Sequence, residues 1–339
     1  MKSLFQLVRQ LIDISSVTGK EGQVGLFIAE HLESAGFWPT LQEVEKGRFN
    51  IYAKASQESD PQIVFCTHLD TVPPFYPSSE DESHIYGRGA CDAKGIMAAM
   101  IVAAERLKAD GLDGVALLFV VGEELDSLGA KFANRLEIGS RYVVVGEPTD
   151  NQLAVGHKGS FKFVLRAKGK SAHSAYPELG DSAVERLINT LNRIRSEDWG
   201  NSGVLGSATV NIGTLAGGVA ANVVPAAAEA RIYVRVVGEV SIVQSKLERL
   251  LGDDPNLSYE VISKNDAVFC RTLPGFETLS VSFGTDIPSL ENFGEPLLIG
   301  PGSIEEAHTD HEKIGKGELR ESVEIYCRVV ETLLSLNGE

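Results

Sequence analysis

The chain has 339 residues, of which 43% are hydrophobic and 23% charged, and this composition is typical of a soluble globular protein with one large domain or two ordinary ones. The net charge of −16 at pH 7 argues against nucleic acid or a membrane surface as partner, because both favour a basic surface. The four scattered cysteines predict neither a disulfide framework nor a zinc knuckle, and no apolar run approaches the roughly 20 residues of a membrane span. We therefore expect a cytoplasmic protein.

The first part of the chain alternates predicted helices with predicted strands. Apolar residues at helical spacing alternate with short apolar runs that are typical of buried strands. Alternation of this kind indicates a largely parallel sheet with helices on both faces. The predicted elements are helices at 1–15, Glu21–Ala35 and Ala93–Ala109, and strands at Ile63–Thr67, Val115–Val121 and Tyr142–Val145.

The middle of the chain changes to a β-α-β-β-α-β order, which is typical of a small antiparallel sheet with two helices on one face. Its predicted strands are Gly159–Lys168, Ser207–Leu215, Ala226–Val237 and Leu257–Ile262, and its predicted helices are Asp181–Arg195 and Val240–Leu251. The earlier pattern then returns, with a strand at Leu297–Ile299 and a helix near Glu318–Leu336. We therefore expect an inserted domain at 157–265 and a discontinuous first domain at 1–156 and 266–339.

Acidic residues and a histidine gather where the predicted strands of the first domain end. The carboxyl ends of the strands are the edge at which open α/β sheets bind ligands. Each residue alone has an ordinary explanation as a helix cap or a solvated charge, but the whole set is much harder to explain in that way. The residues at these positions are His68, Asp70, Asp92, Glu123, Glu124 and Glu147, and the loop at Gly300–Glu312 adds His308 and His311 as further candidates.

Six stretches of the sequence together resemble the M20 metallopeptidase family. They are THLDTVP at 67–73, GRGACDAKG at 87–95, GEELDSLGA at 122–130, GEPT at 146–149, GKSAHSAYP at 169–177 and AHTDHE at 307–312. The family includes acetylornithine deacetylase, succinyl-diaminopimelate desuccinylase, aminoacylases and carboxypeptidase G. The resemblance implies an α/β fold with a doubly wound, mostly parallel sheet like that of zinc peptidases, and an inserted α+β domain for dimerisation or as a lid.

The resemblance also implies two divalent metal ions per chain, most often zinc, with cobalt as an alternative. Imidazole and carboxylate donors suit zinc, and a shared carboxylate would hold two ions close together. The family pattern selects His308 over His311, and it implies a cis peptide bond between Asp92 and Ala93. The implied ligands are His68 and Glu147 for one ion, Glu124 and His308 for the other, and Asp92 as the bridge.

The two adjacent glutamates would have different roles. Neighbouring side chains on an extended strand end point to opposite sides, so Glu124 can bind metal while Glu123 faces a metal-bound water. Zinc can lower the pKa of its water from 15.7 to about 7, and Glu123 would then take the proton and pass it to the leaving amine. Asp70 would hydrogen-bond the other nitrogen of His68 and fix its tautomer.

Three residues of the inserted domain match functional positions of the family. His173 would reach into the active site of the partner subunit of a homodimer and stabilise the oxyanion. Asn222 and Arg235 would bind substrate, because a guanidinium offers a bidentate fork to a carboxylate, and Arg231 is the competing arginine.

The activity that we expect is hydrolysis of the amide bond of an N-acyl amino acid, N-acetylornithine or a near relative, as in amino-acid biosynthesis. Glu147 in the GEPT stretch is typical of the deacylase and carboxypeptidase branches of the family. The alternatives are a succinyl-diaminopimelate desuccinylase, and a carboxypeptidase or dipeptidase. A non-catalytic binding relative is disfavoured, because every implied metal ligand and the base are present.

Overall fold

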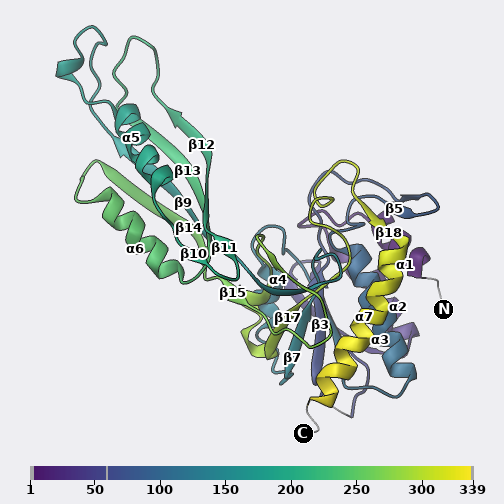
Figure 1. The fold of residues 1–339 in the computed structure, drawn as a ribbon. Helices are drawn as coiled ribbons and strands as arrows, with labels where there is room; N and C mark the ends of the chain where they lie inside the picture. The colour runs from purple at the N-terminus through teal and green to yellow at the C-terminus, as the bar shows by residue number, and fades with distance from the viewer. Residues whose placement is uncertain (1–3, 59, 337–339) are drawn as a thin grey trace. The chain divides into compact units, whose positions relative to one another are not determined.

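The structure, a computed structural model, describes residues 4–58 and 60–336 and divides the chain into two compact units. Unit 1 comprises Met1–Val155, Cys270–Leu279 and Thr285–Glu339, and unit 2 comprises Gly156–Phe269 and Ser280–Gly284 (Figure 1). The first segment of unit 2 lies close to the expected insertion at 157–265. Its second segment has no signal in the sequence pattern.

Unit 1 is built on a six-stranded sheet with the order β1-β2-β6-β3-β7-β17. The strands β6, β3, β7 and β17 run parallel to one another, whereas β1 and β2 form an antiparallel hairpin at one edge. The sheet is therefore mostly parallel, as predicted, but the hairpin was not predicted. The bounds are β1 Trp38–Glu45, β2 Arg48–Lys54, β3 Ile63–His68, β6 Val115–Val120, β7 Tyr142–Val145 and β17 Glu295–Leu298.

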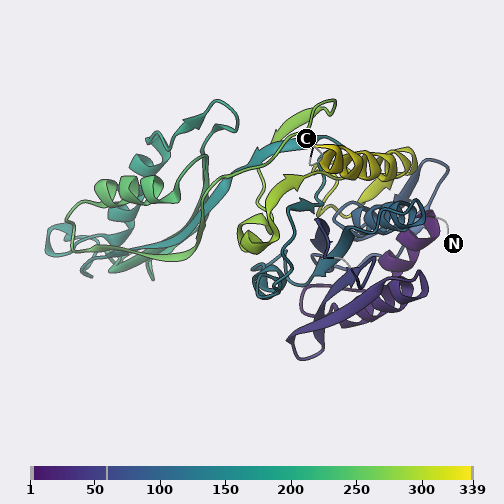
Figure 2. The ribbon, with the colours of Figure 1, turned by 90° about the horizontal axis from the view of Figure 1, so that it is seen from below.

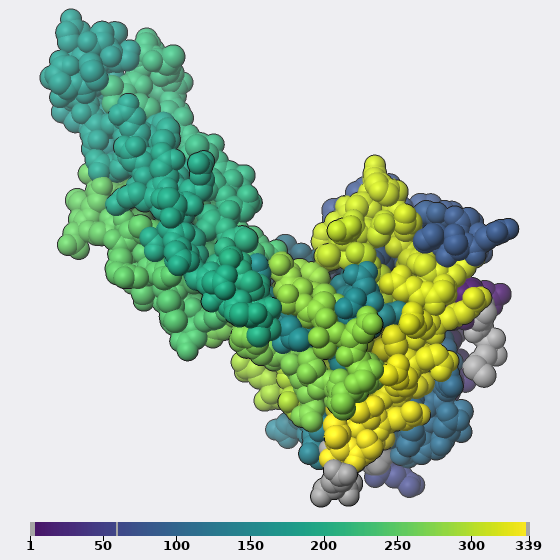
Figure 3. Space-filling model, in the orientation of Figure 1, coloured from purple at the N-terminus to yellow at the C-terminus, as the bar shows by residue number. Residues whose placement is uncertain are grey.

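Helices cover both faces of this sheet (Figure 2). Two adjacent residues of β2 point to opposite faces: Ile51 packs beside Gly25 of α2, and the side chain of Asn50 donates to the main-chain oxygen of Gly129 in α4 at 2.8 Å. The helices α1, α3 and α7 pack into the core on the face of the sheet that α2 covers. The outer face of α7, in yellow, is exposed at the surface in Figure 3. Their bounds are α1 Leu4–Asp13, α2 Gly22–Ser34, α3 Lys94–Ala109, α4 Leu128–Ala133 and α7 Lys316–Ser335.

A second, small sheet in unit 1 has the order β18-β5-β4 and joins segments far apart in sequence. Ile314 of β18 pairs with Ile85 of β5, so the chain just after the His308 loop lies beside the chain just before the Asp92 segment. The peptide bond between Asp92 and Ala93 is cis, as expected. The strands are β4 Ser79–Glu80, β5 His84–Tyr86 and β18 Lys313–Gly315.

Unit 2 contains an antiparallel sheet with the order β12-β13-β9-β14 and two helices packed on one of its faces. Burial alternates along β13, and the buried side chains, such as Ile232 and Val234, share a core with Leu187 of α5 and Leu247 of α6. The predicted β-α-β-β-α-β order is therefore present. Its elements are β9 Gly159–Lys168, α5 Ala183–Ser196, β12 Thr209–Gly217, β13 Ala227–Val236, α6 Val240–Leu251 and β14 Leu257–Asn265.

The remaining elements are short. They are the strands β8 Leu153–His157, β10 Asn201–Ser202, β11 Gly206–Ser207, β15 Val268–Phe269 and β16 Thr278–Val281, and the 3-10 helices Pro177–Leu179, Ile287–Ser289 and Glu291–Phe293. Within residues 4–58 and 60–336, no helix combines the length and the apolar character that a bilayer span requires.

Candidate metal centre

Four of the predicted ligands meet at the carboxyl edge of the unit 1 sheet. Nε2 of His68, at the end of β3, lies 2.9 Å from Oδ1 of Asp92, and Nε2 of His308 lies 3.3 Å from Oδ2 of the same carboxylate. Glu124 Oε2 is 3.0 Å from His308 Nε2, and donor atoms of His68, Asp92 and Glu124 all lie within 4.8 Å of one another. The Asp92 carboxylate therefore lies between the two imidazoles and offers one oxygen to each side, which is the arrangement that a bridging ligand needs.

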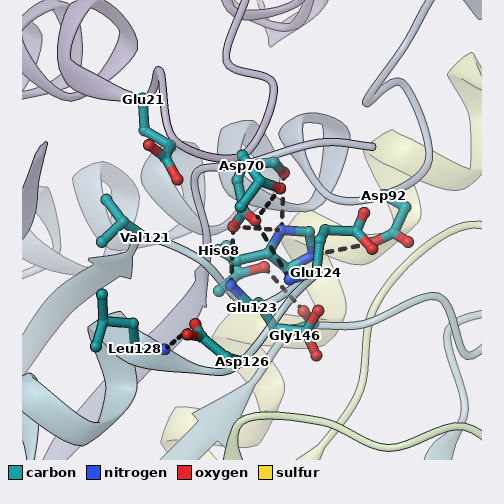
Figure 4. A network of polar contacts seen from close by, with 12 residues as sticks. Glu21, His68, Asp70, Asp92, Val121, Glu123, Glu124, Asp126, Leu128 and Gly146 are labelled. Atoms are coloured by element: carbon teal, nitrogen blue, oxygen red, sulfur yellow. Dashed lines mark hydrogen bonds and ion pairs between the residues drawn. The ribbon is translucent and has the colours of Figure 1, made fainter. Parts of the chain in front are cut away.

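The adjacent glutamates lie in a turn, so the expectation of an extended strand end is wrong. Strand β6 ends at Val120, and Gly122 takes a φ of 78°, which favours glycine and starts the turn. The N–H groups of Glu123 and Glu124 donate to the two carboxylate oxygens of Asp70, at 3.0 and 3.2 Å (Figure 4). The Asp70 carboxylate, and not strand alternation, therefore holds the two glutamates in place.

Asp70 contacts His68 in a different way from the one expected. Nδ1 of His68 lies 2.9 Å from the main-chain oxygen of Asp70 but 3.7 Å from its carboxylate. The carboxylate is already occupied by the Glu123–Glu124 turn and by the hydroxyl of Thr18, which donates at 2.8 Å. A bond from Nδ1–H to this carbonyl leaves Nε2, which faces Asp92, as the nitrogen that could bind a metal ion once it loses its proton, so a main-chain contact would set the expected tautomer.

The centre concentrates negative charge away from water. Burial raises the pKa of Glu123 well above its ordinary value, against the opposing charge of His68. Burial also raises the pKa of Glu147, which is 5% exposed, and the charge of Glu123 adds to that shift. For Asp92, burial works in the same direction, but hydrogen bonds from His308 and His68 outweigh it and keep its pKa below the ordinary range. Hydrogen bonds to Asp92 and Glu124 raise the pKa of His308 to about 10.

These groups fit a cation site. Buried carboxylates are costly unless a positive charge compensates them, and this donor set of imidazoles and carboxylates is the one that zinc and similar ions prefer. Glu147 lies near the same centre, because it follows β7, which pairs with β3 up to Cys66, and the charges of Glu123, His68 and Asp92 act on its pKa. His311 does not join the cluster: its imidazole is 73% exposed and pairs with Asp310 at 2.6 Å.

Sequence reasoning missed two further acids near the centre. Asp286 is 3% exposed, Oδ1 of its carboxyl has no hydrogen-bond partner within the part of the chain that the structure describes, and burial raises its pKa to about 6. Glu312 is 2% exposed and contacts the main chain of Asp92. Asp286 carried no sequence signal, whereas Glu312 stood unassigned at the end of the AHTDHE stretch.

The predicted residues of the inserted domain all lie in unit 2. His173 and Asn222 occupy neighbouring loops, because the N–H of Ser174 donates to the main-chain oxygen of Asn222 at 3.0 Å. Arg235 is half-buried on β13, with its guanidinium 4.3 Å from the ring centre of Tyr233. The competing Arg231 is exposed on the same strand. The roles of these residues toward metal and substrate stay predictions.

Comparisons with known proteins agree with this fold. The sequence pattern described as peptidase family M20/M25/M40 matches residues 64–332. A probable carboxypeptidase of Emericella nidulans is 39% identical over 376 aligned positions, which cover 97% of this chain and 89% of that protein. The name of this relative refers to neither a deacetylase nor a desuccinylase.

Solved structures with low sequence identity share the fold. Aminopeptidase PepT of Bacillus cereus matches with a TM-score of 0.80 at 22% identity, over 98% of both chains. A dinuclear metal-binding peptidase of the M20 family from Bacillus subtilis matches with a TM-score of 0.71 at 18% identity, over 97% of this chain and 98% of that one. The fold is thus the α/β fold of zinc peptidases, and the protein is a hydrolase of the metal-dependent peptidase class. The chain belongs to peptidase family M20/M25/M40.

Proposed function

We propose that this protein is a carboxypeptidase or dipeptidase that hydrolyses the amide bond next to a free carboxylate in small peptides, with two divalent metal ions at the centre described above. The observation that carries the proposal is the position of the Asp92 carboxylate between the imidazoles of His68 and His308. Glu124 contacts the His308 imidazole, and Glu123 is the neighbour of Glu124 in the chain. The name of the Emericella relative supports a peptidase over the N-acetylornithine deacetylase that we first expected.

The residues fit two ions in the way that the resemblance implies. His68 and Glu147 would hold one ion, Glu124 and His308 the other, and Asp92 would bind both. Bound there, the ions would polarise the scissile carbonyl and lower the pKa of the attacking water. Zinc is the proposed metal, with cobalt as the alternative, because nitrogen donors stand beside the carboxylates.

Proton transfer falls to Glu123. Its carboxyl lies next to the ligand Glu124 on a turn that Asp70 fixes, so it can accept the proton of the attacking water and deliver it to the leaving nitrogen. Burial raises the pKa of Glu123, and a raised pKa makes its carboxylate a stronger acceptor for the proton of the water.

Unit 2 would supply the contacts to substrate. Arg235 is the proposed partner of the substrate carboxylate: none of the carboxylates in residues 4–58 and 60–336 forms an ion pair with it. Asn222 would bind the substrate, and His173 would stabilise the oxyanion of the partner subunit in a homodimer. The largely exposed edge strand β12 supports such a dimer, because an unpaired edge can pair with a second copy.

A reducing cytoplasmic location also belongs to this proposal. All four cysteines are free, and Cys66, Cys91 and Cys327 are buried. Burial raises the pKa of the Cys66 and Cys91 thiols well above their ordinary values, so both are expected to be unreactive.

A panel of substrates tests the activity. The holoenzyme, prepared with zinc or cobalt, is assayed on dipeptides, tripeptides, N-blocked dipeptides, C-terminally amidated dipeptides, N-acetylornithine and N-succinyl amino acids. We expect hydrolysis of the peptides with a free carboxylate and none of the amidated ones, since Arg235 would lose its partner. Hydrolysis of N-blocked dipeptides separates a carboxypeptidase from a dipeptidase. A kcat/KM for N-acetylornithine above that of every peptide would contradict the proposal and favour the deacetylase.

A further inference from the structure

A buried ion pair lies directly behind the Asp92 turn. Glu312 ends the loop that carries His308, Arg88 precedes Asp92 by four residues, and each of the two is 2% exposed. Nη1 of Arg88 donates to Oε2 of Glu312 at 2.6 Å, and Nε of Arg88 donates to the main-chain oxygen of Pro74 at 3.2 Å. Both charged groups are therefore held inside unit 1.

The other oxygen of Glu312 binds the turn that carries the bridging ligand. Oε1 accepts the N–H of Cys91 at 2.9 Å and the N–H of Asp92 at 3.0 Å. The main-chain oxygen of Glu312 accepts the N–H of Gly87 at 3.0 Å. One residue thus contacts both ends of the segment from 87 to 92 and ties it to the His308 loop.

Fold stability is a weak explanation for this arrangement. Taking a carboxylate and a guanidinium out of water is costly, and a well-packed apolar pair of similar volume is often as stable or more so. A charged pair differs from an apolar pair because its hydrogen bonds are directional, and they fix the orientation of the groups that they join. Here those groups are the main chain at Asp92 and, through the chain itself, the loop of His308.

We propose that Glu312, fixed by Arg88, is a positioning residue that holds the Asp92 turn and the His308 loop in the geometry that binds metal. The inference rests on the metal-dependent activity proposed above and names a residue that neither the motifs nor the ligand set assigned. Glu312 acts through Asp92 and His308 and touches neither ion nor substrate. Loss of such an outer contact typically weakens metal affinity by about 10–100-fold.

The substitution Glu312→Gln tests this directly. The amide oxygen can still accept the N–H groups of Cys91 and Asp92, but the amide NH₂ then faces the Arg88 guanidinium, donor against donor. In competition with a chelator, we expect metal affinity about 10–100-fold below that of the wild type. At limiting metal kcat falls while KM stays near the wild-type value, and excess zinc restores kcat.

Unit 2 offers a control pair with the same kinds of partner, although its side chains are half-buried and those of Arg88 and Glu312 are buried. The Asp254 carboxylate accepts Nη1 of Arg186 and, at 2.9 Å, the N–H of Asn256, so it has the same kinds of partner as Glu312. None of the proposed metal ligands belongs to unit 2. Asp254→Asn should lower the melting temperature and leave metal affinity unchanged, which separates a lost ion pair from a lost positioning contact.

The outcomes are distinguishable from failure of the proposed function. Wild-type protein that binds no divalent ion contradicts the function itself. If the wild type binds metal and both Glu312→Gln and Glu312→Asp bind it with equal affinity, the positioning role is overturned. Glu312→Asp belongs in this test because the shorter side chain cannot reach all of the Glu312 partners.

A measurement on the wild type covers the case in which the variants fail to fold. Hydrogen exchange of peptides spanning 87–93 should be slow before metal is added, because Glu312 already binds the N–H groups of Cys91 and Asp92. Protection that appears only after metal addition would show that the metal, and not Glu312, orders the turn.

Discussion

The main sheets of the two units differ in where their charged side chains lie. In unit 1, the strands β3 and β6 are buried along their whole length, and buried or half-buried charged residues stand at their carboxyl ends. In unit 2, β13 alternates between buried and exposed side chains, and its buried positions are all apolar. Unit 2 thus follows the ordinary rules of a two-layer α+β domain, whereas unit 1 breaks them at one edge.

The difference indicates that unit 1 carries destabilising buried acids at the edge of its sheet where the proposed metal centre lies. Asp70, Asp92, Glu147 and Asp286 are each at most 7% exposed, and such acids destabilise a fold unless cations or donors compensate them. The core of unit 2, whose residues the structure describes in full, consists of apolar side chains and contains no buried acid. We therefore expect changes in unit 1 to separate activity from stability, and changes in the core of unit 2 to alter stability alone.

Removal of metal should have the largest effect on turnover. Chelation is expected to abolish activity, and zinc or cobalt should restore it, with about two ions bound per chain by elemental analysis. The melting temperature should rise with metal concentration, because the ions bind only the folded state. A protein that keeps full activity with one ion per chain would contradict the dinuclear proposal.

Replacement of the proposed base should have the next largest effect. Glu123→Gln is expected to lower kcat by about 10²–10⁴-fold while metal content persists, because Glu124 and not Glu123 is the proposed ligand. Without metal, this variant should melt at a higher temperature than the wild type, since it removes one acid from a group of buried acids. The matched change Glu124→Gln should instead lose metal, and the reverse pattern would mean that the two roles are exchanged.

The loss of His173 should cost about 10²–10³-fold in kcat, as for the removal of one oxyanion donor in other hydrolases. If His173 serves the partner subunit, inactive His173→Ala and Glu123→Ala chains should recover activity when they are mixed. One site of the mixed dimer then contains both intact groups. Subunit exchange that is demonstrated by mass, but restores no activity, would exclude a shared site.

Local patterns account for the elements that the sequence predicted well. The apolar runs of β3, β6 and β7 and the helical periodicity of α6 each depend on neighbouring residues, and all four elements appear within one residue of their expected bounds. The hairpin β1–β2 was missed because β1 is an edge strand with mostly exposed side chains and no regular alternation. A pattern of burial cannot reveal a strand that buries little.

The residues of the candidate site that lie in short sequence motifs could be predicted. The residues that act through contacts with parts of the chain far away in sequence could not. His68 ends β3 and Glu124 lies in the turn that follows β6, so the apolar runs of these strands led to both residues. The contact of Glu312 with Asp92 spans 220 residues, and Asp286 sits in a loop without any pattern. The direction of Glu123 was predicted from a strand that ends earlier than expected, although Gly122 could have signalled the turn.

The smallest effect on turnover is expected from the core of unit 2. Leu247 of α6 is fully buried in that core, and Leu247→Ala should lower the free energy of unfolding by about 2–5 kcal/mol. Below the melting temperature, metal content and kcat should stay within about twofold of the wild type, because every proposed ligand lies in unit 1.

The matched change in unit 1 makes this last comparison sharp. Leu117→Ala removes an equally buried leucine from β6, the strand that leads into the Glu123–Glu124 turn, and creates a cavity of the same kind. Its cost in stability should be similar, but it should also weaken metal binding and lower kcat, because β6 positions the turn. Denaturant unfolding, chelator competition and steady-state kinetics on both variants decide the question. If Leu247→Ala loses as much metal as Leu117→Ala, the two units are energetically coupled, and the separation of chemistry from stability between them is wrong.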